Sequence, residues 1–261
     1  MPASSGTAKI CGYDVFEQAL EIRKLIGYLP ETPPLYSDMV VYDYLSFAAR
    51  LRNVPLKNTQ SAVEQVIEKC SLKEVRERII GRLSKGYQQR VGIAQALVHD
   101  PDILILDEPT IGLDPIQIIE IRKLIQELAL SHTIILSSHI LPEITQICKR
   151  VIIISDGQIA AVDSLDALTT RLHKGERLLL KVRQNSSEIL EKLRALKKVN
   201  AVTEHQPAHF TIDCEPNADI QDEIAQLSLD NKWGIVELKP VSMTLEDIFL
   251  KLTLEENEVQ Q

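Results

Sequence analysis

Apolar side chains recur every three or four residues through much of the chain before residue 100, a period typical of helices. The pattern predicts helices over 40–52, 59–70 and 84–99, and Ser84 opens the last of them as an N-cap. A strand is expected over 22–29, because this apolar stretch ends where a group of prolines enforces a loop.

Short, wholly apolar runs replace this period from Ile103 onward, and such runs are typical of buried strands. Strands are expected at 103–106, 134–136, 151–154 and 159–162, with helices over 117–130 and 142–148. Because strands alternate with helices, the pattern predicts a parallel sheet of the α/β class.

Beyond about residue 163 the pattern changes to short strands and helices, which predict a separate small α+β domain. Strands are expected at 178–182, 199–203, 210–213 and 235–238, and helices at 187–196, 220–229 and 245–252. We therefore predict a first domain over 1–163 with a helical subdomain at about 38–99, a helical connector over 164–175, a C-terminal domain over 176–253 and a frayed tail over 254–261.

The composition is that of a soluble globular protein, with 44% hydrophobic and 25% charged residues among 261. Basic residues are scattered and the net charge is −8, so the sequence does not suggest a nucleic-acid partner.

The four cysteines form no C-x-x-C site, which favours a reducing compartment over a disulfide frame. The longest purely apolar stretch, Val151–Ile154, falls far short of the roughly 20 residues that span a bilayer. Together with the absence of a signal peptide pattern, this predicts a cytoplasmic protein whose membrane role would depend on a partner.

Two adjacent carboxylates, Asp107 and Glu108, follow the apolar run that begins at Ile103. Ligands of open α/β sheets bind at the carboxyl ends of the strands. One carboxylate there can hold Mg²⁺ and a second can orient a water, and phosphoryl transfer requires both tasks. A strand can also end in acidic residues simply to begin a turn, so this pair alone does not decide the chemistry.

Three neighbouring features favour a catalytic role of this acidic pair over a role in the turn alone. Ser84 and Gly86 open a helix whose N-terminal amides suit an anion. A tight turn over 112–115 precedes the next helix, and His139 follows the next strand. Each feature alone is also compatible with a purely structural role.

Together these elements resemble the ABC transporter ATPases, in order and in spacing, over nearly the whole chain. The matching segments are Leu83–Gln88 for the signature loop, Leu104–Glu108 for the Walker B strand, Gly112–Pro115 for the D-loop, His139 for the switch histidine and Gly27–Glu31 for the Q-loop. Two of these segments depart from the commonest family pattern. Lys85 and Tyr87 replace the commonest residues of the signature loop, and Glu31 replaces the glutamine of the Q-loop. The resemblance implies a P-loop NTPase-like nucleotide-binding domain that takes ATP and Mg²⁺.

The resemblance also implies roles for the residues on the two sheet-end loops and the Q-loop. Asp107 would hold Mg²⁺ through water, and Glu31 would offer the same ion a second oxygen. Glu108 would be the base that polarises the attacking water. His139 would hydrogen-bond the γ-phosphate of ATP and that water.

The remaining roles concern partners. Ser84, Gly86 and Gln88 would bind ATP held by a second ATPase subunit, paired head to tail, and Asp114 would link the two sites. A membrane-spanning permease would complete the transporter. The variant signature loop and the C-terminal domain resemble the exporter branch that serves drugs, sodium efflux and gliding motility. The loop over 31–39 and the helix over 40–52 are expected to contact the permease, unless their aromatic side chains only close the local core.

One part of the family pattern is not found in this sequence. The family carries an aromatic residue that stacks on adenine, followed by a G-x-x-x-x-G-K-[ST] loop that wraps the phosphates. None of the ten glycines here is followed by lysine. We therefore expect that the chain begins inside the domain and, as given, binds ATP weakly. Two functions follow: an ATP-hydrolysing subunit that powers export at the inner face of the cell membrane, or a truncated, non-hydrolysing partner or remnant that supplies only the signature half-site.

Overall fold

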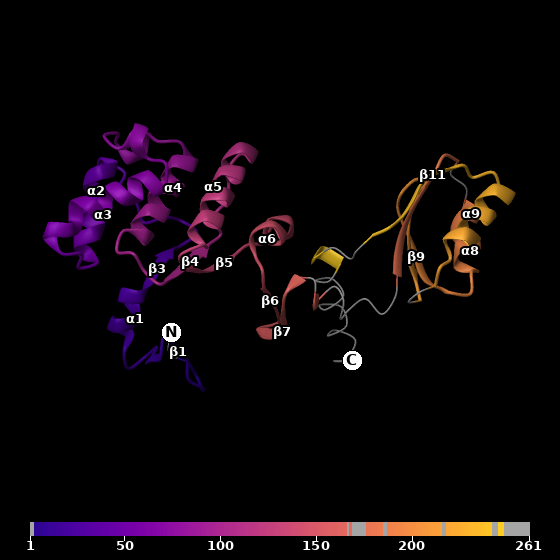
Figure 1. Ribbon diagram of the computed structural model, residues 1–261, viewed down its shortest axis with the longest axis horizontal. Coiled ribbons are helices and arrows are strands. Elements are labelled where there is room, and N and C mark those ends of the chain that lie inside the picture. Colours follow the sequence, from indigo (N-terminus) through magenta and orange to yellow (C-terminus); the bar gives the residue numbers. More distant parts are fainter. Residues whose placement is uncertain are drawn as a thin grey trace. The chain divides into compact units, whose positions relative to one another are not determined.

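A computed structural model describes most of the chain as two compact units, Met1–Glu143 and Ile144–Gln261 (Figure 1). The described residues are 3–165, 167–168, 176–184, 187–215, 218–241 and 245–247. The helices expected over 165–172 and 245–252 and the tail over 254–261 lie largely or wholly outside these residues. The domain boundaries expected near 163 and 176 stay predictions.

The centre of the first unit is a three-stranded parallel sheet in the order β3 (Ile26–Leu29), β4 (Ile103–Asp107) and β5 (Thr133–Ser137). Leu104 and Leu106 alternate along β4 and are both fully buried. On this face Gly27 allows α4 (Lys85–Leu97) to approach β3 closely, since a Cβ at Gly27 would lie 2.2 Å from the Ala96 carbonyl oxygen. The sheet is therefore fixed against α4 by a contact that only glycine permits.

The segment 22–29, expected to be one strand, is divided between two elements. Residues Ala19–Leu25 form α1, and only Ile26–Leu29 form β3. Within α1 the side chains of Glu21 and Lys24 pair at 2.9 Å, a contact that helical spacing allows. The expectation was wrong because a short apolar stretch does not by itself distinguish a strand from a helix.

Helices cover the rest of the first unit. The expected helices over 40–52 and 59–70 are present as α2 (Val41–Leu51) and α3 (Leu56–Lys69), which pack together. Two short 3₁₀ turns, η1 (Lys73–Val75) and η2 (Ile80–Arg82), lead to α4, and α5 (Pro115–Leu128) follows β4. A small hairpin of β1 (Lys9–Ile10) and β2 (Tyr13–Asp14) precedes α1.

The two strands after α6 (Leu141–Ile147) do not join the parallel sheet, contrary to expectation. β6 (Val151–Ser155) and β7 (Gln158–Asp163) form an antiparallel hairpin of their own. Asp156 and Gly157 form its turn, with φ of 47° and 78°. An Asp-Gly dipeptide between apolar runs favours a two-residue hairpin turn, and this local preference explains the antiparallel pairing.

The C-terminal residues form a βαββαβ unit with the antiparallel order β11-β8-β10-β9, which is the ferredoxin-like arrangement. Its elements are β8 (Glu176–Val182), α8 (Ser187–Arg194), β9 (Val199–Gln206), β10 (His209–Cys214), α9 (Gln221–Asp230) and β11 (Ile235–Pro240). Both helices lie on the same side of the sheet (Figure 1). Alternate strand residues such as Leu180, Phe210 and Ile212 form the core beneath them.

No helix among the described residues is both long and apolar enough to span a bilayer.

Candidate active site

The carboxyl ends of β4 and β5 meet because the two strands run parallel and in register. Asp107 stands opposite Ser137, whose hydroxyl donates a hydrogen bond to the Asp107 carboxylate. The Glu108 amide donates to the Ser137 carbonyl and hydroxyl oxygens, at 3.2 Å each. Ser137 therefore holds both adjacent acidic residues at the sheet edge.

Glu108 has a strained backbone. Its φ of 46° lies in the left-handed region, which costs a non-glycine residue roughly 1–3 kcal/mol outside ordinary turns. The turn also directs its side chain inward, where only 16% is exposed and Oε2 lies 2.9 Å from His139 Nδ1. Two residues far apart in the sequence are thus in direct contact at the end of the central strand.

The contact with Glu108 shifts the pKa of His139. The hydrogen bond to the Glu108 carboxylate, and then the negative charge of that carboxylate, raise the pKa of His139. Smaller contributions in the same direction come from Glu143 and Glu31, which places the Q-loop glutamate within electrostatic reach of the imidazole. The structure therefore brings Glu108, His139 and Glu31 into one electrostatic environment.

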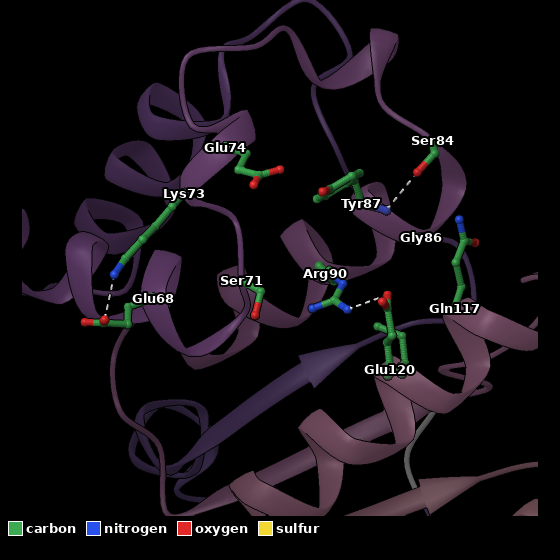
Figure 2. Close-up of a pocket in the computed structure, with 11 residues that line it drawn as sticks. Glu68, Ser71, Lys73, Glu74, Ser84, Gly86, Tyr87, Arg90, Gln117 and Glu120 are labelled. Carbon is green, nitrogen blue, oxygen red and sulfur yellow. Dashed lines mark hydrogen bonds and ion pairs between the residues drawn. The ribbon is translucent and has the colours of Figure 1, made fainter.

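The α4 N-terminus borders a cavity of about 520 Å³, shown in Figure 2. Ser84 caps the helix, accepting a hydrogen bond from the Tyr87 amide at 3.4 Å. The two cations that line the cavity already have partners: Lys73 pairs with Glu68 at 2.7 Å, and Arg90 with Glu120 at 2.8 Å. An anion entering here would therefore depend on the first-turn amides of α4 and on the Ser84 hydroxyl.

The turn over 112–115 packs against the start of α4. Asp114 caps α5 and accepts hydrogen bonds from the Ile116 and Gln117 amides, both at 3.0 Å. The Gln117 side chain fills the space beside Gly86, and the Lys85 ammonium fills the space beside Gly112, which has a φ of 66°. The two loops that the sequence singled out on either side of β4 are thus neighbours.

Gln88 and Glu31 lie along a second cavity, of about 490 Å³. The Gln88 amide nitrogen donates to the carbonyl oxygens of Ile80 and Leu83, so it is held by its own loop. Lys85 and Ile111 also line this space. Gln88 therefore belongs to a different cavity from Ser84 and Gly86, and its role toward a nucleotide stays a prediction.

The comparisons with known proteins agree on one family. A family model described as "ABC transporter" matches residues 1–111. The bacitracin transport ATP-binding protein BcrA of Bacillus licheniformis is 33% identical over 251 residues, covering 95% of this chain and 79% of that protein. The chain belongs to the ABC transporter ATP-binding proteins.

Other ABC relatives share the similarity. The linearmycin resistance ATP-binding protein LnrL of Bacillus subtilis is 27% identical over 257 residues, covering 97% of this chain and 82% of the relative. Among solved structures, CbiO1 of Clostridium perfringens, described as part of the ABC transporter complex CbiONQ, aligns with a TM-score of 0.57 and 27% identity. That alignment covers 65% of this chain and 72% of CbiO1. The fold is thus that of an ABC ATPase, and the chain is an ATP-binding subunit that powers a transporter.

The donor set fits Mg²⁺ bound together with a nucleotide rather than a metal held by protein alone. Among the described residues, no group of three or more His, Cys, Asp or Glu side chains is arranged to hold a metal ion. Mg²⁺ in phosphoryl-transfer sites is typically bound by one or two carboxylates, with water and substrate phosphates completing the shell. Asp107 and Glu31 can supply such carboxylates.

Three polar residues of this ABC subunit were not identified from the sequence. They are Ser137 at the end of β5, Thr110 in the loop after β4 and Glu143 in α6. The Thr110 hydroxyl donates to the Glu143 carboxylate at 2.5 Å, and both side chains are buried. The position of Glu143, four residues after His139, was the available signal.

Proposed function

We propose that this chain is the ATP-hydrolysing subunit of an exporter, bound peripherally to the inner face of the cell membrane, with Glu108 as the general base. The contact between Glu108 and His139 at the end of β4 carries the proposal. It brings together a carboxylate and an imidazole, the groups suited to activating a water and binding a phosphate.

In this proposal Glu108 accepts the proton of the attacking water, and its low exposure keeps the carboxylate from being surrounded by solvent. His139, whose pKa is raised by Glu108, donates a hydrogen bond toward the γ-phosphate. Asp107, held by Ser137, and Glu31 would bind Mg²⁺ through water. The ion, when bound, neutralises the charge of the phosphates.

We propose a second ATPase subunit as a partner, because the α4 N-terminus would bind the phosphate of a nucleotide held elsewhere. Ser84 and Gly86 line the cavity of Figure 2, and its cations are already paired within the chain. The Asp114 turn packs beside this helix, so a nucleotide on one subunit could influence the turn of the other.

We also propose that a permease docks on an aromatic patch formed by Tyr36, Tyr44 and Phe47. The Tyr36 and Phe47 rings are 5.7 Å apart and remain 54% and 40% exposed. Tyr44 is buried and donates to the Pro34 carbonyl oxygen, so it closes the local core. The patch therefore combines one core residue with two exposed rings, a composition that favours interfaces.

A non-hydrolysing partner that supplies only the signature half-site is the second candidate. The observation that favours it is that no Gly-Lys pair occurs in the 261 residues, so the sequence as given contains no Walker A loop.

The test is Glu108→Gln, with Glu127→Gln on the exposed end of α5 as the matched control. In a chain to which a Walker A segment has been added, and in membranes that contain the permease, we expect Glu108→Gln to reduce ATP turnover about 10²-fold or more while ATP binding persists. The control should behave as wild type. Equal turnover by Glu108→Gln and wild type would reject Glu108 as the base. If neither turns over ATP, but wild type stimulates an intact ABC subunit and Ser84→Ala does not, the second candidate holds.

A further inference from the structure

Thr110 and Glu143 form a buried polar pair beside the catalytic corner. The Thr110 hydroxyl donates to Glu143 Oε2 at 2.5 Å, and the two residues are only 1% and 5% exposed. They lie on different segments, Thr110 in the loop after β4 and Glu143 in the first turn of α6.

The Thr110–Glu143 bond is a second contact between the two segments that carry Glu108 and His139. Glu108 contacts His139 at 2.9 Å, and Thr110 and Glu143 lie shortly after these two residues along the chain. The Thr110 carbonyl also accepts a hydrogen bond from the Leu113 amide, which ties it to the turn that leads to Asp114. One close contact between the Glu108 and His139 side chains, at 2.9 Å, and one hydrogen bond between Thr110 and Glu143 therefore join the same two segments.

A buried carboxylate needs a reason, because removing a charge from water is costly unless it is well paired. An apolar pair would pack at this position without that cost. Unlike an apolar contact, a short hydrogen bond between a hydroxyl and a carboxylate is directional. It therefore fixes the distance and the orientation between the two segments that carry the groups.

We propose that Thr110 and Glu143 are positioning residues that hold His139 against Glu108 and connect this contact to the turn over 112–115. The proposal rests on the proposed function only for the roles of Glu108 and His139. Neither positioning residue touches the reacting atoms. Their bond instead keeps the segment after β5 from moving away from the segment after β4.

The test observes the imidazole directly, in the full chain without nucleotide and at one fixed pH. Long-range ¹H–¹⁵N spectra report the His139 Nδ1–H that donates to Glu108, and a His139→Gln sample assigns the signal. We expect Thr110→Val to lose this hydrogen-bonded signal and Thr110→Ser to restore it. Glu143→Gln, which keeps an oxygen to accept from Thr110, should retain it.

If Thr110→Val alone does not fold, Thr110→Val/Glu143→Leu removes both polar partners and leaves no buried charge unpaired. This double variant should fold and still lose the His139 signal. A folded Thr110→Val or double variant with an unchanged His139 signal would overturn the proposal. In membranes that contain the permease, Thr110→Val should lower kcat for ATP by up to about 10²-fold with little change in KM. Because the spectra need no ATP, they distinguish failure of this proposal from failure of Glu108 as the base.

Discussion

The parallel sheet of the first unit and the antiparallel sheet of the C-terminal unit bury alternate apolar residues in the same way, but they use charged groups differently. In the C-terminal unit, Arg177 is paired with Asp213 and with Asp247. In the first unit, Asp107 and Glu108 stand together at the end of β4, and Glu108 has a left-handed backbone.

The two units differ in whether their charged side chains have partners of opposite charge. The guanidinium of Arg177 has two carboxylate partners within the C-terminal unit, so its charge is satisfied without a ligand. Acidic residues gathered at the end of a parallel strand repel one another unless a cation or a proton joins them. In the C-terminal unit the charges neutralise one another, whereas the acidic pair at the end of β4 leaves room for a cation.

The largest effect should come from the C-terminal core. Phe210 is 1% exposed, and Phe210→Ala should lower the free energy of unfolding of this unit by about 3–5 kcal/mol. Trp233, the only tryptophan and 3% exposed in the same core, reports the transition by fluorescence in urea. Val236→Ala, at a half-exposed position, is the control. An unchanged tryptophan transition in Phe210→Ala would contradict the assigned core.

The matching change in the first unit is Gly27→Ala. The added methyl group would collide with the Ala96 carbonyl oxygen and the Leu104 side chain, and overpacking of this kind costs about 1–3 kcal/mol. Unfolding followed by circular dichroism should shift while the Trp233 transition does not. Thr133→Ala on the exposed side of β5 should have little effect. Equal shifts of both transitions would show that the two units unfold as one.

A smaller loss should follow from removing the α5 cap. Asp114→Ala deletes the acceptor for the Ile116 and Gln117 amides and should cost about 1 kcal/mol, whereas Asp114→Asn keeps an acceptor and should cost less. The urea midpoint of the first unit measures both. If Asp114→Asn proved as costly as Asp114→Ala, the charge of Asp114 rather than its capping bond would be the stabilising factor.

The smallest effect concerns two histidines. The hydrogen bond and charge of Glu108 raise the pKa of His139, whereas burial, followed by the charge of Arg52, lowers the pKa of His99. The His139 contribution to stability is therefore fully present below the ordinary pKa near 6.5 and is lost as the pH rises through its folded value. Proton NMR should show His139 titrating at higher pH than His99, and Glu108→Gln should lower the titration of His139 while leaving that of His99 unchanged. Coincident titrations in wild type would contradict the Glu108 contact.

Sequence patterns predicted the elements where the period was long, as in α2 and α3, and failed where a short stretch was ambiguous. The 22–29 segment contains too few turns to reveal its helix. A parallel sheet was expected from the alternation of strands and helices, whereas the Asp156-Gly157 turn makes the last two strands of that stretch a hairpin.

Some features of the candidate site were predicted from the sequence, and others were not. Asp107 and Glu108 were found because they follow a buried apolar run in sequence, and the structure then placed His139 against Glu108. Contacts across segments could not be read from spacing. The Ser137 bond to Asp107 depends on the register of β4 and β5, and the Thr110 bond to Glu143 depends on the start of α6.

Strand topology also has a consequence for the order of folding. Pairing of Ile26 with Ile103 closes a long loop of chain before its hydrogen bonds can form, and such nonlocal contacts form slowly. β9 and β10, by contrast, are joined by the short turn at Pro207 and Ala208, so their contacts are local. We therefore expect that the β9–β10 hairpin forms early during folding, whereas the corner that carries Asp107 and Glu108 is completed late, when three distant segments have met.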